Sequence, residues 1–531
     1  MAVPPLHSSS TVATGPAGVS GALRVSLARD VVLGLLIAVL LPLALVSVPN
    51  TISVVAGLLP PDLSAAGMIK AHGLALPAMV LTVPLAAWAV LRLPAAPVLV
   101  GGLALLAVAE AVGGYADSAA LVGVLRVVHG VGAGLLIPAS LMAVWRRAPV
   151  LKALWAASLA SGLLAAQALA LWPLDQVTSW RVTLQPYPMV TGVALVLAAV
   201  YMVLWLTGGG DDRPVAEAGE RRRLLIAAAP AAGIALLALG AAGDWAFDLV
   251  NGVALVSVVA LLVLASLGAT AGEGGRPAAH AFVAVGVVVL PTAAQVTFVE
   301  LGGLGGPGLS GLWLPFGVAV AVAAVAAILT GRVPERSSGR LPYLGLLAVV
   351  GGLCAVRLIV PVPQGGPLIL PFALVAGGTA VALTAVLRTA RTGAALFALA
   401  LCFPAMLAGF LLGSGIQVPR VRTAGSPQAM VDAFVDSLHL WALAGGFILV
   451  AVIVLGAVLG RRRSAPGTHA AASGVPEVPR PAGPEWPGED DDEDAGHDAD
   501  WEGQPSAPEL PSVPPPTPSP EGSPNGGHQE R

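Results

Sequence analysis

The chain alternates between long apolar segments and short segments that carry most of its charges. About fourteen apolar segments of about 20 residues follow one another between residues 31 and 460, and a helix needs this length to cross a bilayer. A membrane-spanning β-strand would instead alternate apolar and polar residues over about ten positions. The pattern therefore predicts membrane-spanning helices near residues 31–58, 70–91, 96–115, 119–145, 151–172, 187–207, 223–241, 248–269, 280–300, 309–331, 342–361, 367–387, 393–415 and 438–460.

Composition supports this interpretation. The chain is 56% hydrophobic and 11% charged, with a mean hydropathy of +0.84, whereas soluble proteins are about 45–50% apolar and about 25% charged. We therefore expect an all-α polytopic membrane protein whose partner is the lipid bilayer. The two cysteines, Cys354 and Cys402, both lie in apolar segments, which argues against a disulfide framework or a metal cluster.

The sequence contains no feature typical of an enzyme or of a nucleic-acid-binding protein. It has no GxxxxGK[ST] loop, so we do not expect the chain to hydrolyse ATP. No combination of a nucleophile, a general base and an orienting group stands out in the sequence as a catalytic site. We expect no cofactor, no bound metal and no nucleic-acid partner.

Basic residues are distributed unevenly between alternate loops. With a cytoplasmic N-terminus, Lys and Arg in the inner loops outnumber those in the outer loops by about four to one, as the positive-inside rule requires. This bias predicts an even number of spans with both termini in the cytoplasm, and we expect the protein in the plasma membrane. Tryptophans fall near predicted span ends, where they would anchor the helices at the interfaces: Trp145, Trp155, Trp172, Trp180, Trp205, Trp245, Trp313 and Trp441.

The chemistry of the chain changes after Arg463. Residues 464–531 are rich in Pro, Gly, Ser and acidic residues, including the acidic run from Glu489 to Asp494. Such a segment cannot bury enough apolar surface to offset its ordering entropy, so we expect a disordered cytoplasmic tail. It is either a solubilising extension or a docking segment for a protein partner.

One predicted helix carries a charge where a membrane span should have none. Arg126 lies within the apolar segment 124–141, and His129 follows three residues later. An arginine at membrane depth costs about 2.5–3.5 kcal/mol on insertion scales, so an intramembrane arginine indicates a functional site. Gly130 and Gly134 would let a neighbouring helix approach closely. The competing interpretation is that Arg126 extends to the outer interface and that the glycines serve packing only.

A carboxylate lies at a similar predicted depth. If the third and fourth spans join near Asp117, Glu110 and Arg126 both lie roughly 10–14 Å below the outer rim, at 1.5 Å per residue. We therefore consider an ion pair between them, with His129 on the same helical face as Arg126 and His72 facing the same half-cavity. This group is either a proton relay or a static structural pair.

The segment LRVVHGVGAGLLIPASLMAV resembles the fourth-helix signature of the major facilitator superfamily, and in particular of its fourteen-helix drug:proton antiporter branch. Arg126, Gly130 and Pro138 occupy the matching positions, while His129 replaces a Gln. The run Ser179–Arg181 is similar to the SWR that opens the sixth helix of that family. Gln295, with the GGLGGPGLSGLWLP segment after it, resembles its ninth-to-tenth helix region.

The loop GRVPERSSGR resembles the charged cytoplasmic loop of the second half of these transporters. Its matching residues are Gly331, Arg332, Glu335, Arg336, Gly339 and Arg340, which the resemblance assigns to the cytoplasmic gate. Three features depart from the family: the first-half loop keeps only Arg92, the helix-five glycine-proline signature is missing, and Asn50 stands where an acid is expected.

The resemblance implies two six-helix bundles that alternate access around a central cavity. The implied organisation is a cytoplasmic segment at 1–28, bundles at 29–207 and 280–463, a linker with two extra helices at 208–279, and the tail at 464–531. Asn50, His72 and Gln295 are candidate residues of the substrate cavity, although Gln295 is also interpreted as an interhelical hydrogen-bond partner.

The resemblance implies secondary transport, namely efflux, with protons as a candidate coupling ion. Because few polar groups line the expected cavity, we expect the substrates to be small hydrophobic or amphipathic compounds. The alternative is a transporter-like scaffold or regulatory protein that does not transport and acts through its tail. The missing acid and helix-five signature favour the scaffold, whereas Arg126 and the 331–340 loop favour transport.

Overall fold

The computed structural model describes residues 16–175, 177–208, 218–243, 245–268, 275–301, 306–334 and 339–464. These residues contain fourteen helical segments that are long and apolar enough to cross a membrane, and they contain no β-strand. The predicted all-α polytopic fold and the predicted number of spans are therefore confirmed. The tail predicted at 464–531 lies outside the described residues from position 465 onward.

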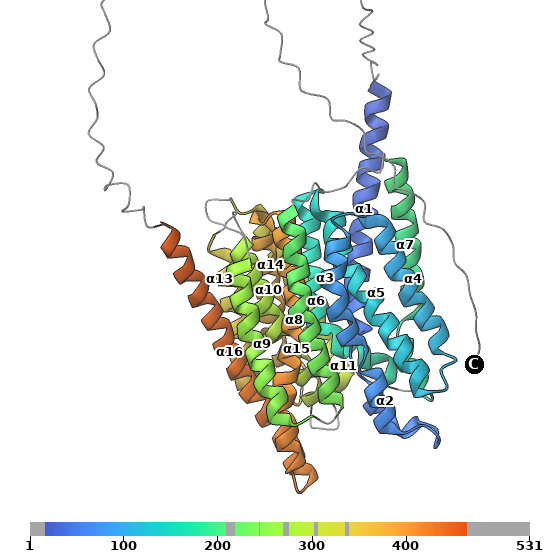
Figure 1. The fold of residues 1–531 in the computed structure, drawn as a ribbon, viewed down its shortest axis with the longest axis vertical. Helices are drawn as coiled ribbons and strands as arrows, with labels where there is room; N and C mark the ends of the chain where they lie inside the picture. Colours follow the sequence, from blue (N-terminus) through green and yellow to red (C-terminus); the bar gives the residue numbers. More distant parts are fainter. Residues whose placement is uncertain are drawn as a thin grey trace, which may run out of the picture. The chain divides into compact units, whose positions relative to one another are not determined.

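Figure 1 shows the helices in their order along the chain. Their bounds are α1 Pro16–Val46, α2 Ala65–His72, α3 Ala75–Ala89, α4 Ala95–Gly113, α5 Ala119–Trp145, α6 Pro149–Leu171, α7 Pro188–Thr207, α8 Ala218–Ala242, α9 Phe247–Gly268, α10 Gly275–Val299, α11 Gly308–Arg332, α13 Leu341–Ile359, α14 Ile369–Thr389, α15 Thr392–Arg422 and α16 Pro427–Ser464. Four short 3₁₀ helices accompany them: η1 Ile52–Leu58, η2 Trp172–Leu174, η3 Trp180–Leu184 and η5 Gly366–Leu368. Together α2 and α3 form one span.

The first span differs from its prediction. It was expected over residues 31–58, but α1 ends at Val46 and residues 52–58 form the separate helix η1. Pro49 provides the physical reason, because proline lacks the backbone N–H that would continue the helix and disfavours helical geometry in the residue before it. At its other end α1 already begins at Pro16, so it includes part of the segment expected at 1–28.

Two groups of helices repeat the same pattern of neighbours. In the N-terminal group, α1–α7, the contacting pairs are α3–α5, α4–α5, α1–α6, α1–α7, α4–α7 and α1–α5. In the C-terminal group, α10–α16, six pairs match these: α11–α14, α13–α14, α10–α15, α10–α16, α13–α16 and α10–α14. The contacts α5–α6 in the first group and α10–α13 and α15–α16 in the second have no such match. Each pair in the second series corresponds in order to a pair in the first. The chain therefore packs two six-helix units by one common scheme, while the exact residue limits of the domains stay predictions.

The two groups meet along corresponding helices. Helix α6 packs against α11, and the corresponding pair α3 and α15 also pack together. The extra helices α8 and α9 lie against α3, α15 and α10 (Figure 1). The most apolar windows of α6, α10 and α15 are each 89% buried, compared with 28% for α7, α9 and α16. The former helices are therefore central and the latter peripheral.

Four of the tryptophans expected at the membrane interfaces are instead buried, namely Trp155, Trp180, Trp205 and Trp441, and two of them form hydrogen bonds between helices. Trp155 and Trp441 are 0% and 1% exposed. Their indole N–H groups donate to Ser140 Oγ at 2.9 Å and to Thr292 Oγ1 at 3.0 Å, respectively. A buried indole needs such a hydrogen-bond partner, so both side chains join helices inside the protein rather than anchoring them in lipid headgroups.

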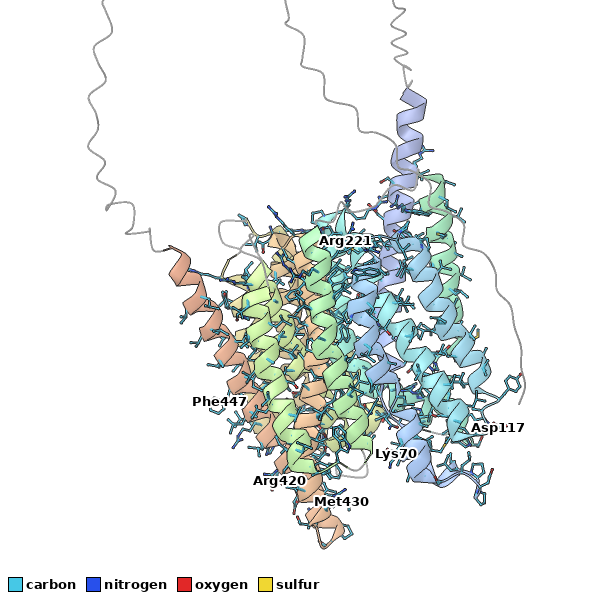
Figure 2. The ribbon with its side chains drawn as sticks, in the orientation of Figure 1. Lys70, Asp117, Arg221, Arg420, Met430 and Phe447 are labelled. Atoms are coloured by element: carbon cyan, nitrogen blue, oxygen red, sulfur yellow. The ribbon has the colours of Figure 1, made fainter. Side chains whose placement is uncertain are left out.

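The loops lie at two opposite ends of the helical unit. In Figure 2, Arg221 lies at one end, whereas Lys70, Asp117 and Arg420 lie at the other. This separation agrees with the predicted assignment of Arg221 to the cytoplasm and of the other three residues to the outside. We refer to the end with Lys70, Asp117 and Arg420 as the predicted outer end.

Candidate functional site: a buried arginine and two buried carboxyl groups

Arg126 of α5 is buried, with 2% of its surface exposed. Its Nε donates to the carbonyl oxygen of His72 at 2.9 Å, and its Nη2 donates to the carbonyl oxygens of Val48 and Pro49 at 2.8 and 3.0 Å. His72 is the last residue of α2, and Val48 and Pro49 follow the end of α1. Helix ends leave carbonyl groups unpaired and carry partial negative charge, so they suit a buried cation.

Three further polar residues from the sequence prediction surround this arginine. His129 is 1% exposed; its Nδ1 lies 3.0 Å from the Leu125 carbonyl oxygen, and its Nε2 has no hydrogen-bond partner. His72 is fully buried and interacts electrostatically with Arg126 and His129. The amide nitrogen of Asn50 donates to the Ile69 carbonyl oxygen at 2.9 Å. We call Asn50, His72, Arg126 and His129 the Arg126 cluster.

The expected ion pair between Glu110 and Arg126 is wrong. No ion pair joins them among the described residues, and Glu110 of α4 lies beside Thr191 of α7 instead. The depth argument fixed how far each residue lies along its helix, but not which way each helix faces. Because α5 turns Arg126 toward α1 and α2 while α4 turns Glu110 toward α7, the charges do not meet. Glu110 is nevertheless buried, at 4% exposure, and its Oε2 has no partner. A proton relay through Glu110 stays a prediction.

Gln295 lies in another part of the molecule, where α10 meets α15. A Cβ placed on Gly413 of α15 would be 2.5 Å from Gln295 Nε2, so the two helices approach closely there. The side-chain oxygen of Gln295 is buried without a hydrogen-bond partner. Gln295 therefore belongs to the helix interface of the C-terminal group, apart from the Arg126 cluster.

The predicted cytoplasmic gate loop is only partly described. Gly331 and Arg332 end α11, Gly339 and Arg340 directly precede α13, and Glu335 and Arg336 lie outside the described residues.

Arg388 connects α14 to the end of α11 in this region, although the sequence prediction treated it only as one of the basic residues of the inner loops. Arg388 at the end of α14 donates to the carbonyl oxygens of Thr330 and Val333, at 2.6 and 2.8 Å. The Thr330 carbonyl oxygen also accepts the Val333 N–H at 3.3 Å, so Arg388 adds a second donor there and supplies the donor for the Val333 carbonyl oxygen just after α11.

Glu300 was also missed, because it falls at the very end of a predicted span. It is fully buried just after α10; its Oε1 accepts a hydrogen bond from the Val362 N–H at 3.2 Å, and its Oε2 has no partner. Burial raises the pKa of Glu300 from its ordinary 4.5 to about 7, against the opposite effect of the Val362 N–H. The sequence signal that could have identified Glu300 is its position as a charged residue directly after an apolar run.

The described residues also contain a small pocket where the two helix groups meet. Its volume is 190 Å³, and it is formed by α1, α6 and α11 with Ser158 and Ser161 as its hydroxyl-bearing residues. The other lining residues are Ala38, Pro42, Leu154, Ala157, Gly162, Ala165, Leu169, Val320 and Ala324. Within the described part of the chain, no group of three His, Cys, Asp or Glu side chains is arranged to hold a metal ion.

Comparison with known proteins gives matches among solved structures but none by sequence. No protein-family model matches the chain, and no curated protein matches its sequence. Among solved structures, the chain is similar to the proton:xylose symporter XylE, a major facilitator superfamily protein, bound to 6-bromo-6-deoxy-D-glucose. The match covers 81% of this chain and 95% of XylE, at 12% identity and a TM-score of 0.49, which is too distant to assign a substrate or coupling ion to this chain.

Proposed function

We propose that this protein is a secondary transporter of the major facilitator type, which exports small hydrophobic or amphipathic compounds in exchange for protons. The observation that carries the proposal is the repeated pairing scheme of α1–α7 and α10–α16. Two similarly packed units that meet along corresponding helices are the architecture that alternating access requires, because one unit can rock against the other around a site between them.

The contacts between the groups suit such a movement. The pairs α6–α11 and α3–α15 occupy corresponding positions in the two units. At the predicted cytoplasmic end, a Cβ on Gly331 of α11 would lie at an ordinary contact distance of 3.8 Å from Ala153 Cβ of α6. Small residues at helix contacts provide packing without interlocking side chains.

The pocket between the groups supports a mainly apolar substrate. Serine hydroxyl groups provide its only polar side chains, and alanine and other apolar residues make up the rest of the lining. A mainly apolar pocket with few polar groups favours hydrophobic or amphipathic molecules over sugars and ions, which need many hydrogen-bond partners.

The Arg126 cluster has a defined part in this proposal. Its three hydrogen bonds join α5 to the ends of α1 and α2, so these elements move as one unit at the predicted outer end. Charged donors make stronger hydrogen bonds than neutral ones, and they offset part of the cost of burying the guanidinium. Loss of Arg126 should therefore uncouple the outer parts of the N-terminal group from one another.

The test is proton-gradient-driven transport in inverted membrane vesicles, with a panel of lipophilic cationic and neutral dyes. We expect wild type to move at least one dye and Arg126→Ala to abolish that movement at equal abundance. Arg420→Ala is the matched control, because Arg420 is exposed and donates to Ile416 of its own helix.

Deletion of residues 466–531 separates the transport proposal from the scaffold alternative. A transporter should keep its dye movement without the tail. If no dye moves in any variant while deletion of the tail removes a co-purifying protein partner, the scaffold function is supported and the transport proposal fails.

A further inference from the structure

The two helix groups touch at the predicted outer end through apolar side chains. The rings of Trp172, at the start of η2, and Trp313 of α11 meet edge to face, with centroids 4.2 Å apart. Phe298, Leu301 and Leu309 of the C-terminal group pack against an apolar cluster of the N-terminal group. That cluster consists of Ile52, Val55, Met68, Ala109, Ala116, Val122, Leu125, Leu171, Leu174, Trp180 and Leu184. We call these contacts the outer contact.

Glu300 adjoins the outer contact along the chain. Leu301, the next residue, and Phe298, two residues before Glu300, both belong to the contact. The side chain of Glu300 itself is fully buried. Its backbone carbonyl accepts the N–H of Gly308 at 3.1 Å, which closes the turn between α10 and α11. A fully buried ionisable group thus lies between two residues that touch the N-terminal group.

The other side of Glu300 faces the segment that connects α13 to η5. The Val362 N–H donates to Glu300, and the Val360 carbonyl oxygen lies 2.8 Å from Nε2 of His439 on α16. The His439 carbonyl oxygen in turn accepts from Arg357 at 3.2 Å. Residues 360–362 therefore bridge the ends of α10 and α16, and Glu300 is one of their two anchors.

No opposite charge stabilises an ionised Glu300 in this arrangement. The connecting segment 360–368 and the turn between α10 and α11 contain no other titratable residue. The titratable groups near this end of the adjoining elements are His439, Arg357, Asp432, Asp436, Arg420 and Arg422 in the C-terminal group, Asp248 on α9, and Lys70, His72, Asp175 and Arg181 in the N-terminal group. Among the described residues, no ion pair to Glu300 is formed, and Oε2 has no hydrogen-bond partner.

We propose that Glu300 is a proton-binding site of the outer contact, neutral while the two helix groups touch and ionised when they separate. Burial without a counter-charge favours the neutral carboxyl group, and hydration on opening favours the carboxylate. This inference rests on the proposed function in one respect only, namely that alternating access must open the outer contact.

The expected size of the effect follows from proton linkage. The closed contact holds the Glu300 proton with a pKa of about 7, and a hydrated carboxyl group would return to its ordinary 4.5. The closed form then binds the proton more tightly, so its share falls as pH rises. With these values the ratio of open to closed forms rises about tenfold between pH 6 and pH 8 and levels off at higher pH.

Cysteine accessibility tests the proposal without any substrate. Cys354 and Cys402, the two native cysteines, are replaced, and Leu309→Cys reports on the outer contact in protein held in lipid nanodiscs. Maleimide labelling is measured from pH 6 to pH 8. Because thiols react faster at higher pH, each rate is divided by that of Ser310→Cys, an exposed neighbour. We expect this ratio to rise about tenfold.

Glu300→Gln mimics the permanently neutral group, so its ratio should stay low and independent of pH. The matched control is Asp436→Asn, an exposed carboxylate on α16 at the same end, which should keep the full pH dependence. The proposal is overturned if the labelling ratio does not change with pH in protein that keeps Glu300. It is also overturned if the ratio still rises with pH in Glu300→Gln, even if transport is demonstrated. Complete protection of Leu309→Cys at every pH would mean that the outer contact does not open, which contradicts alternating access itself.

Discussion

Gly130 offers a sharp test of the packing that positions Arg126. A Cβ added at Gly130 would lie 2.8 Å from Ala78 Cβ and 2.9 Å from the Met79 backbone nitrogen, and closer still to the Ala75 carbonyl oxygen. Ordinary contact begins at 3.4 Å, so α3 and α5 must separate by at least about 0.6 Å to accept one methyl group. The atoms in the way belong mostly to the α3 backbone, which cannot rotate aside.

Overpacking of this kind costs about 1–3 kcal/mol. We therefore expect Gly130→Ala to lower the free energy of unfolding in detergent by that amount. Because Gly130 lies one turn beyond Arg126 on the same helix, the separation should also stretch the bond from Arg126 to the His72 carbonyl oxygen, and dye transport should fall more than stability alone explains.

The matched control is Gly101→Ala on α4, where an added Cβ would meet nothing within 4 Å. This substitution should be neutral or stabilise the helix by up to about 1 kcal/mol, since alanine has the higher helix propensity. Equal unfolding free energies for the two variants would refute the close approach of α3 and α5.

Three further outcomes are expected. Arg126→Lys should keep the charge but reduce transport at least tenfold in the vesicle assay, because one ammonium group cannot reproduce the guanidinium fork that reaches three carbonyl oxygens. Arg388→Ala should destabilise the protein by about 1–3 kcal/mol in detergent unfolding, because it removes two charged hydrogen bonds and leaves the Val333 carbonyl oxygen after α11 without its donor. Trp441→Phe should cost about 1–3 kcal/mol in the same assay by leaving Thr292 without its partner, and Thr292→Val in the Trp441→Phe background should recover part of that loss.

The sequence predicted the helices well because their signal is local. Apolar runs of membrane length must form helices, since backbone groups in a bilayer have no water to pair with. The span 119–145 was placed at its observed limits. The first span failed at its end because hydropathy does not register the break that Pro49 introduces.

The candidate site was predicted in part. Arg126 stood out because a lone charge in an apolar run must find partners, but its partners are backbone carbonyls of α1 and α2, which no side-chain pattern reveals. Glu110 was assigned to the wrong neighbour because depth along a helix leaves its rotation open. Glu300 was overlooked because its burial depends on packing between distant segments, around positions 300 and 362.

We propose that the two helix groups open alternately at their two ends. Spin labels at Asp117 and Met430, both at the predicted outer end (Figure 2), and a second pair at Arg92 and Arg391, at the predicted cytoplasmic end, allow both separations to be measured by pulsed electron resonance. We expect that a shift from pH 6 to pH 8 increases the population with a long outer distance while the cytoplasmic distance shortens. Outer and cytoplasmic distances that lengthen together would contradict alternating opening, whereas distances that do not respond to pH would overturn the proton site at Glu300.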